Sequence, residues 1–157
     1  ELGVEGVVSG ILREDFSVDV ERTKALVELS KPMHFTFHRA FDWVAQPMES
    51  LRVLEEIGVD TVLTSGQFPS AEQGLHLLEA WQKQTSMTVM AGGGVAPGNA
   101  LLFKKIGLHA VHCSGTSFGN SIELKGKISM NSPKHLVEDA FASTNVETVR
   151  KIVQAVK

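Results

Sequence analysis

Several residue types are scarce or missing from this sequence, and each absence excludes a class of protein. Tyrosine is absent and aromatic residues make up only 6% of the chain, so a stacking platform for nucleic-acid bases is not expected. The single cysteine, Cys113, excludes an internal disulfide framework and favours a reducing, cytoplasmic compartment. No apolar run approaches the ~20 residues that span a bilayer, and the first residues do not form a signal peptide.

Charge and length are those of an ordinary soluble domain. The net charge is −3, with 21% of the residues charged. This near balance gives no reason to expect nucleic acid or an anionic membrane as a partner. A chain of 157 residues, 43% of them hydrophobic, predicts one domain that spans residues 1–157.

Short apolar segments alternate with amphipathic segments along most of the chain. Strands are predicted at residues 4–10, 33–38, 61–64, 88–91 and 109–113, and helices at 20–29, 48–57, 70–84, 99–106 and 146–156. Ser70 is the expected N-cap of its helix, with Gln73 completing a capping box. Residues 114–144 are expected to be irregular, and Trp43 and Trp81 are expected to pack in the core.

The predicted strands indicate an α/β protein with a parallel sheet. They are continuous apolar runs without clean alternation, as in strands that helices cover. A closed TIM (β/α)8-type barrel needs eight strands and about 250 residues. The residues alone therefore leave two architectures open. One is an open doubly wound sheet, and the other is an incomplete barrel that holds only strands four to eight.

Four of the predicted strands end in small or functional residues. These endings are FTFHRAFD at 35–42, TVLTSG at 61–66, TVMAGGG at 88–94 and AVHCSG at 110–115. Because parallel strands place their carboxyl ends on one edge, where α/β barrels keep their chemistry, these endings predict a shared rim. We expect His38, Thr64, Gly92 and His112 to lie near it.

The first of these endings carries the candidate catalytic residues His38, Arg39 and Asp42. Strand alternation places His38 on the same face as Thr36, toward the lumen, as a general acid/base or metal ligand. The alternative is a buried, hydrogen-bonded histidine. Arg39 suits an anion, or else an ion pair with Asp42 or Asp60. For Asp42 the favoured interpretation is an N-cap of the following helix.

The triple glycine at Gly92, Gly93 and Gly94 is the centre of a candidate anion site. Its N–H groups and the dipole of the following helix suit an oxyanion, whereas the alternative is a tight turn that needs positive φ. Thr64 and Ser65 could hydrogen-bond a ligand or satisfy the backbone at a turn. The full set of candidate anion-binding residues is Thr64, Ser65, Gly92, Gly93, Gly94, His112 and Ser114.

Cys113 is the candidate metal ligand. A thiolate binds Cu(I) well, and Met90 on the neighbouring strand could assist. Alternation, however, sets Cys113 beside Val111 and toward the helices, with His112 on the opposite face. A small buried hydrophobe is therefore the favoured interpretation. The sequence has no CxxC, Met-rich or HExxH motif.

As an ordered set, FTFHRAFD, TVLTSG, MAGGGV and HCSG resemble the CutC family of copper-homeostasis proteins, from Val4 to about Asn131. Members of that family are single TIM barrels. The resemblance implies that this chain holds strands four to eight of such a barrel, and it favours the incomplete barrel over the open sheet. It also implies a cytoplasmic role in copper handling, with copper as Cu(I).

Three kinds of function remain open. The first is a Cu(I)-binding homeostasis protein. The second, which the residues alone favour, is a lyase- or isomerase-like barrel enzyme that acts on a small anionic or phosphorylated substrate at the rim. The third is a non-catalytic chain that pairs with another chain. The expected partners are a metal ion or a small anionic ligand, and the open barrel edges predict a homo-oligomer.

Overall fold

The protein is built around one parallel β-sheet. The computed structural model describes residues 3–119, 125–126, 128 and 142–157. The sheet has five strands in the order β1-β2-β3-β4-β5. They are β1 Gly6–Ser9, β2 His34–Phe37, β3 Thr61–Thr64, β4 Thr88–Gly92 and β5 Ala110–His112. Neighbours in the chain are neighbours in the sheet, as in a barrel, whereas the order reverses in a doubly wound sheet.

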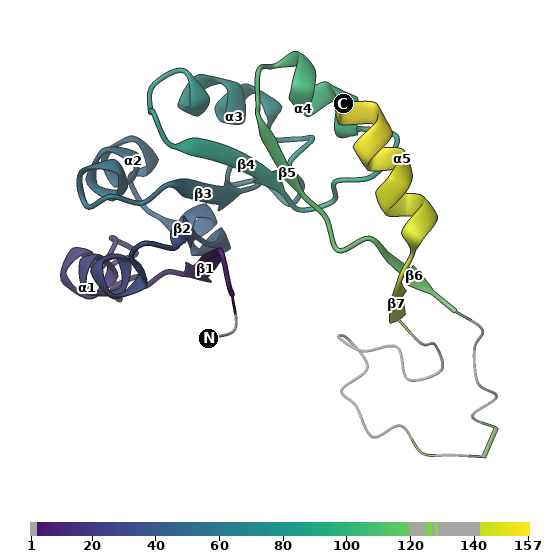
Figure 1. Cartoon of the computed structure of the whole chain (residues 1–157), viewed down its shortest axis with the longest axis horizontal. Helices are drawn as coiled ribbons and strands as arrows, with labels where there is room; N and C mark the ends of the chain where they lie inside the picture. Colours follow the sequence, from purple (N-terminus) through teal and green to yellow (C-terminus); the bar gives the residue numbers. More distant parts are fainter. Residues whose placement is uncertain (1–2, 120–124, 127, 129–141) are drawn as a thin grey trace.

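Helices cover one face of this sheet. They are α1 Val20–Ser30, α2 Pro47–Glu56, α3 Leu75–Gln82 and α4 Ala100–Lys105, and a short 3₁₀ helix, η1 Arg39–Trp43, lies between β2 and α2. Figure 1 shows the strands as an arc with these helices along its outer side. The five strands do not close, so the predicted incomplete barrel is confirmed.

Strand alternation divides the side chains between the two faces. Phe37 pairs in register with Val62, and Val62 with Val89, and all three are fully buried beneath the helices. Burying one such side chain contributes about 1.5–3 kcal/mol. On the inner face Val8, the partner of Thr36, is 64% exposed. The core of the described residues therefore lies on the convex side of the sheet, beneath the helices (Figure 1).

One helix begins later than its sequence predicts. Residues 70–84 were expected to be helical from Ser70, but α3 begins at Leu75 with Gly74 as its N-cap. At this position the chain passes close to the β3–α3 loop, because a Cβ on Gly74 would lie 2.1 Å from the carbonyl oxygen of Ser65. The predicted capping contact of Ser70 is present one turn ahead of the helix, where its Oγ accepts the N–H of Gln73 at 3.4 Å and its carbonyl accepts the N–H of Gly74.

The expectation of an irregular segment at 114–144 is wrong at both of its ends. There β6 Thr116–Phe118 and β7 Ala142–Thr144 form an antiparallel pair, and most of the residues between them lie outside the described residues. The predicted last helix is present as α5 Val146–Val156, capped by Asn145. It lies beside α4 (Figure 1), where Lys104 donates to the carbonyl of Lys157 at 2.9 Å.

The open sheet predicts self-association. In the described part of the chain β1 pairs only with β2 and β5 only with β4, and Val8 is exposed on the inner face. Unpaired strand edges associate with other chains. We expect the 157-residue chain to form oligomers, as measured by size-exclusion chromatography with light scattering. A monodisperse monomer that unfolds cooperatively would contradict this expectation.

Candidate functional site

The carboxyl ends of the strands form one rim, as predicted. Thr64, Gly92 and His112 are the last residues of β3, β4 and β5, and His38 follows the last residue of β2. Gly92 and His112 are partners in the parallel register. The four strand endings therefore meet at the same edge of the sheet.

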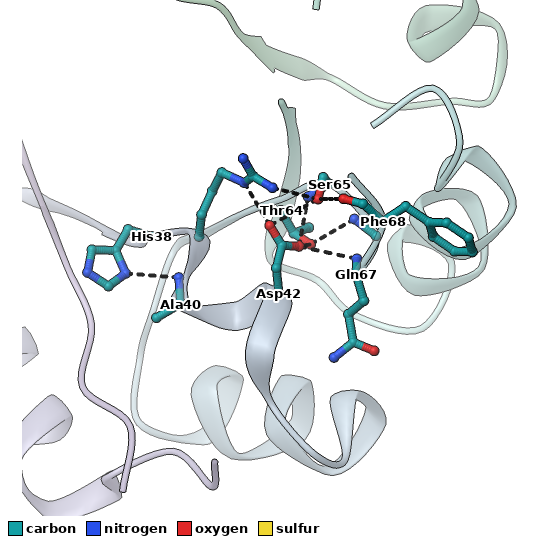
Figure 2. Close-up of polar contacts among 9 residues, drawn as sticks. His38, Ala40, Asp42, Thr64, Ser65, Gln67 and Phe68 are labelled. Atoms are coloured by element: carbon teal, nitrogen blue, oxygen red, sulfur yellow. Dashed lines mark hydrogen bonds and ion pairs between the residues drawn. The ribbon is translucent and has the colours of Figure 1, made fainter. Parts of the chain in front are cut away.

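The carboxylate of Asp42 connects two loops of this rim (Figure 2). Its Oδ1 accepts hydrogen bonds from Thr64 Oγ1 at 2.5 Å, from the Ser65 N–H at 2.9 Å and from the Gln67 N–H at 3.2 Å. The favoured interpretation of Asp42 as a helix N-cap is therefore wrong. The carboxylate instead fastens the β3–α3 loop to η1, and the next helix has Gln46 at its N-cap without a side-chain bond.

Arg39 joins the same group, because residues three apart share one side of a 3₁₀ helix. Its Nε donates to Asp42 Oδ2 at 2.7 Å and its Nη2 to Ser65 Oγ at 2.8 Å. Ser65 Oγ in turn lies 2.6 Å from the carbonyl oxygen of Phe68. Of the predicted ion pairs, the one with Asp42 forms. Asp60 instead accepts the N–H of Phe35 at the other end of the strands.

One nitrogen of Arg39 is left over. Its Nη1 donates to no acceptor among the described residues, and the side chain of Arg39 is 45% exposed. The guanidinium lies against the glycine turn, since a Cβ on Gly93 would be 3.2 Å from Nη1 and 3.3 Å from Ser65 Cβ. A residue larger than glycine at this position would push the arginine away.

The triple glycine forms a tight turn. Gly93 and Gly94 have φ values of +106° and +74°, which other residues rarely adopt, so the turn interpretation is correct. The carbonyl of Gly93 accepts the N–H of Ala71, and that of Gly94 accepts Asn99 Nδ2. Outside the pairing of β4 with β5, the N–H groups of Gly93 and Gly94 donate to no acceptor among the described residues. They remain open beside Arg39.

His38 lies apart from this group. Its Nδ1 accepts the N–H of Ala40 at 3.3 Å, and its half-buried ring occupies the space beside Gly10, where a Cβ would lie 3.0 Å from Nδ1. Figure 2 shows the ring away from the cluster that Asp42 gathers. Of the three candidate catalytic residues, the structure thus joins Arg39 to Asp42 and separates His38 from both.

The other candidate anion-binding residues are placed differently from one another. Thr64 and Ser65 are fully buried, and their hydroxyls contact Asp42, so they position the loop from within. Ser114 accepts the N–H of Thr116 in a local turn. His112 is exposed next to Gly92. Of the candidate residues, Arg39 and the glycine turn lie next to each other and are accessible to the same ligand.

Two residues of the rim were not predicted as functional. Gln67 adopts a left-handed φ of +61°, and its Nε2 donates to the carbonyl of Val44 at 2.7 Å. Trp43, expected in the core, is 73% exposed, whereas Trp81 is buried as expected. A signal for Gln67 was present in the sequence, because it follows Ser65 and Gly66 directly after a strand.

The described residues do not fit a copper site. Cys113 is half-buried and packs against the core beneath the helices, the side that alternation predicts. Met90 is the register partner of Leu63 and Ala110 on strands whose alternate residues face the lumen, so it lies on the opposite face from Cys113. Nowhere in the described ranges do three His, Cys, Asp or Glu side chains gather around a common point.

The arc of parallel strands and the polar rim define an incomplete α/β barrel of the TIM type. A profile described as the CutC family matches residues 1–117. The CutC family protein of Edwardsiella ictaluri is 44% identical over 115 residues, which are 73% of this chain and 46% of that protein. A Klebsiella pneumoniae homologue of the same name is 42% identical, covering 73% and 47%. The chain therefore belongs to the CutC family, and it spans about half the length of these relatives.

Two solved structures agree on the fold. CutC from Streptococcus agalactiae, whose name refers to copper homeostasis, superposes with a TM-score of 0.66 at 23% identity, over 71% of this chain and 56% of that one. A native KDPGal structure gives a TM-score of 0.57 at 17% identity, over 98% and 58%. At these identities the likeness concerns the fold. Separately, none of the described helices has the length and hydrophobicity to cross a membrane.

The position of Asp42 predicts a large effect on stability. Asp42→Ala leaves the buried donors of Thr64 and Ser65 without an acceptor, so the free energy of unfolding should fall by about 3 kcal/mol. Urea denaturation measures the loss. Asp15→Ala is the matched control, because that exposed carboxylate also accepts two bonds, from Ser17. Equal losses in the two variants would contradict the role assigned to Asp42.

Proposed function

We propose that this protein acts in copper homeostasis and that its rim binds a small anionic ligand, not the copper ion itself. Membership of the CutC family supports the first part. One observation carries the second part. The Arg39 guanidinium is held by Asp42 and Ser65, with Nη1 free beside the open N–H groups of Gly93 and Gly94.

These groups suit a carboxylate or a phosphate. The guanidinium has five donors in a fixed plane, and two of its three nitrogens are already engaged by the protein. The oxygens of an anion would accept from Nη1 and from the backbone N–H groups, which together form a charge-assisted site. Because Asp42 fixes the arginine in place, little side-chain entropy would be lost on binding.

The position in the fold also favours a phosphorylated ligand. In TIM barrels the loops after the last two strands often bind phosphate. The glycine turn follows β4, which pairs with β5, the last strand of the parallel sheet. The same proposal includes a cytoplasmic location and a homo-oligomeric state. The free thiol of Cys113 fits the reducing conditions of the cytoplasm.

A lyase- or isomerase-like reaction at this rim is the second candidate, and His38 favours it. Because Nδ1 accepts the N–H of Ala40, the neutral imidazole carries its proton on Nε2. Nε2 has no partner among the described residues and could donate that proton to a bound substrate.

Removal of the arginine tests the anion site. Arg39→Gln should weaken inorganic phosphate binding at least about 10-fold, because a hydrogen bond to a charged group is worth about 1.5–3 kcal/mol. Isothermal titration calorimetry measures the affinity. Arg52→Gln is the control, since the described partners of Arg52 are Glu49 and Glu56 on the surface of α2. Phosphate that binds both variants equally would refute the site.

Cu(I) binding by Cys113 has a separate test. The thiol packs against the core, so Cys113→Ser should bind Cu(I) as the unchanged protein does, with a modest loss of stability from the buried hydroxyl. Competition with a Cu(I) chelator measures the affinity. Complete loss of Cu(I) binding would show that the thiolate is a copper ligand.

A further inference from the structure

A cavity of about 320 Å³ lies between the β1–α1 loop and the start of α2. This volume is at the lower end of the range, about 300–1,000 Å³, that small-molecule sites span. Its lining includes neither Arg39 nor the glycine turn. Apolar side chains such as Val18, Val20 and Val53 form one part of the lining, and polar groups form the rest. The cavity is therefore a separate feature with room for a small ligand.

The two walls of the cavity are tied together by backbone contacts. Residues 12–18 form a small hairpin, because Leu12 and Val18 are joined by an antiparallel bridge. The carbonyl of Phe16 in this hairpin accepts the N–H of Ala45, just ahead of α2, at 3.2 Å. The hairpin and the first turn of α2 are thus held beside each other, and residues of both line one cavity.

The first turn of α2 leaves backbone donors without partners. Gln46 is the N-cap but makes no side-chain bond, and Pro47 at the first helical position has no N–H. The N–H groups of Met48 and Glu49 find no acceptor among the described residues. The carboxylate of Glu49 is itself engaged by Arg52 at 2.6 Å. An anionic group is favoured at such a helix end.

A buried hydroxyl in the same turn is an independent sign of a ligand. Ser50 lines the cavity and is only 7% exposed. Its N–H donates to the carbonyl of Gln46 at 2.9 Å, but its Oγ has no hydrogen-bond partner in the part of the chain that the structure describes. Buried polar groups are nearly always hydrogen-bonded, and an unpaired one lowers stability. A ligand in the cavity would supply the missing bond.

The hairpin contributes one group of each charge to the cavity. The guanidinium of Arg13 makes no ion pair or hydrogen bond with the described residues, so its donors are open to a ligand. Asp15 accepts two bonds on Oδ1, from the Ser17 hydroxyl at 2.6 Å and the Ser17 N–H at 2.9 Å. The hydroxyl bond, and then the backbone bond, hold the pKa of Asp15 below its ordinary value. The cavity thus offers donors to a carboxylate and a charged acceptor to an ammonium group.

We infer that this cavity binds a free amino acid with an aliphatic side chain. The carboxylate of the ligand accepts from Arg13, from the open N–H groups of α2 and from Ser50 Oγ. Its ammonium group donates to the carboxylate of Asp15, and its side chain packs on the apolar part of the lining. The inference goes beyond the proposed function, because it rests on residues outside the anion site at Arg39.

Three probes separate the parts of such a ligand, and isothermal titration calorimetry of the 157-residue protein measures each affinity. L-Leucine carries the carboxylate, the ammonium group and an aliphatic chain, whereas 4-methylpentanoate lacks the ammonium group and glycine lacks the chain. Leucine should bind at least about 10-fold more tightly than 4-methylpentanoate, which cannot make the charged hydrogen bond to Asp15. Leucine should also exceed glycine by at least about 10-fold, since its aliphatic chain is removed from water.

Three variants assign the contacts. Arg13→Gln should weaken leucine and 4-methylpentanoate alike, by about 10-fold, whereas Asp15→Asn should weaken leucine alone. Ser50→Ala should weaken leucine binding about 5-fold. The same variant should retain or raise the urea midpoint of the free protein, because it removes an unpaired buried hydroxyl. A fall in that midpoint with unchanged leucine affinity would show that the hydroxyl is structural and overturn its role.

Two control variants should bind leucine as the unchanged protein does. Arg22→Gln removes an arginine of α1 that lies outside the lining and pairs with Asp19 at 3.7 Å. Arg39→Gln removes the proposed anion site and tests whether the two sites are independent. Loss of leucine binding in Arg39→Gln would place the amino acid at the rim and overturn the inference.

The probes themselves can also overturn the inference. Absence of leucine binding to the unchanged protein would show that the cavity is not an amino-acid site. Equal affinities for leucine and 4-methylpentanoate, unchanged in Asp15→Asn, would exclude the ammonium contact. Tighter binding of N-acetyl-leucine than of leucine would identify the carboxyl end of a peptide as the occupant instead.

Discussion

The buried carboxylate of Asp42 is the interaction on which the rim depends. Only 7% of this side chain is exposed, and a carboxylate removed from water is tolerated only when hydrogen bonds replace its hydration. Its donors come from η1 and from the β3–α3 loop, and through Arg39 its influence reaches the glycine turn after β4. Gln67, whose backbone is left-handed, donates its N–H to Oδ1 of the same carboxylate. One acidic residue thereby helps to fix the relative positions of the three loops that follow β2, β3 and β4.

The fold could be predicted from the sequence where burial imposes a regular spacing of apolar residues. Apolar runs predicted all five strands, and strand alternation predicted the helix side of Cys113. The order of the strands in a barrel followed from the family resemblance, because the residues alone left the doubly wound sheet open. The role of Asp42 could not be predicted, since an N-cap and a clamp across loops use the same residue type. Its partners lie 22 to 25 residues away. The start of α3 was missed by five residues: Ser70 accepts the N–H of Gln73 as a cap would, but the residues up to Gly74 form a turn and the helix begins at Leu75.

The ligands that Cu(I) prefers and the groups that the rim offers differ in chemistry, and they lie at different places in the sheet. Cu(I) prefers thiolate and thioether ligands, and the one thiol of this chain packs toward the helices. The rim offers a guanidinium and backbone N–H groups, which bind anions and repel cations. Membership of the CutC family is therefore compatible with a small-molecule site at the rim, and the copper-related role we propose does not require a copper ligand on this part of the barrel.

The 3₁₀ geometry of η1 decides how the rim can be used. In an α-helix, residues four apart lie on one face, so the indole of Trp43 would cover the guanidinium of Arg39. At three residues per turn, the same two side chains are about 120° apart, and residues three apart coincide, which brings Arg39 onto Asp42. Phe41 anchors the helix in the core from the remaining side. A five-residue segment can thus fasten itself to the core, hold a charged group ready and leave an aromatic ring exposed, because each of these tasks has its own side of the helix.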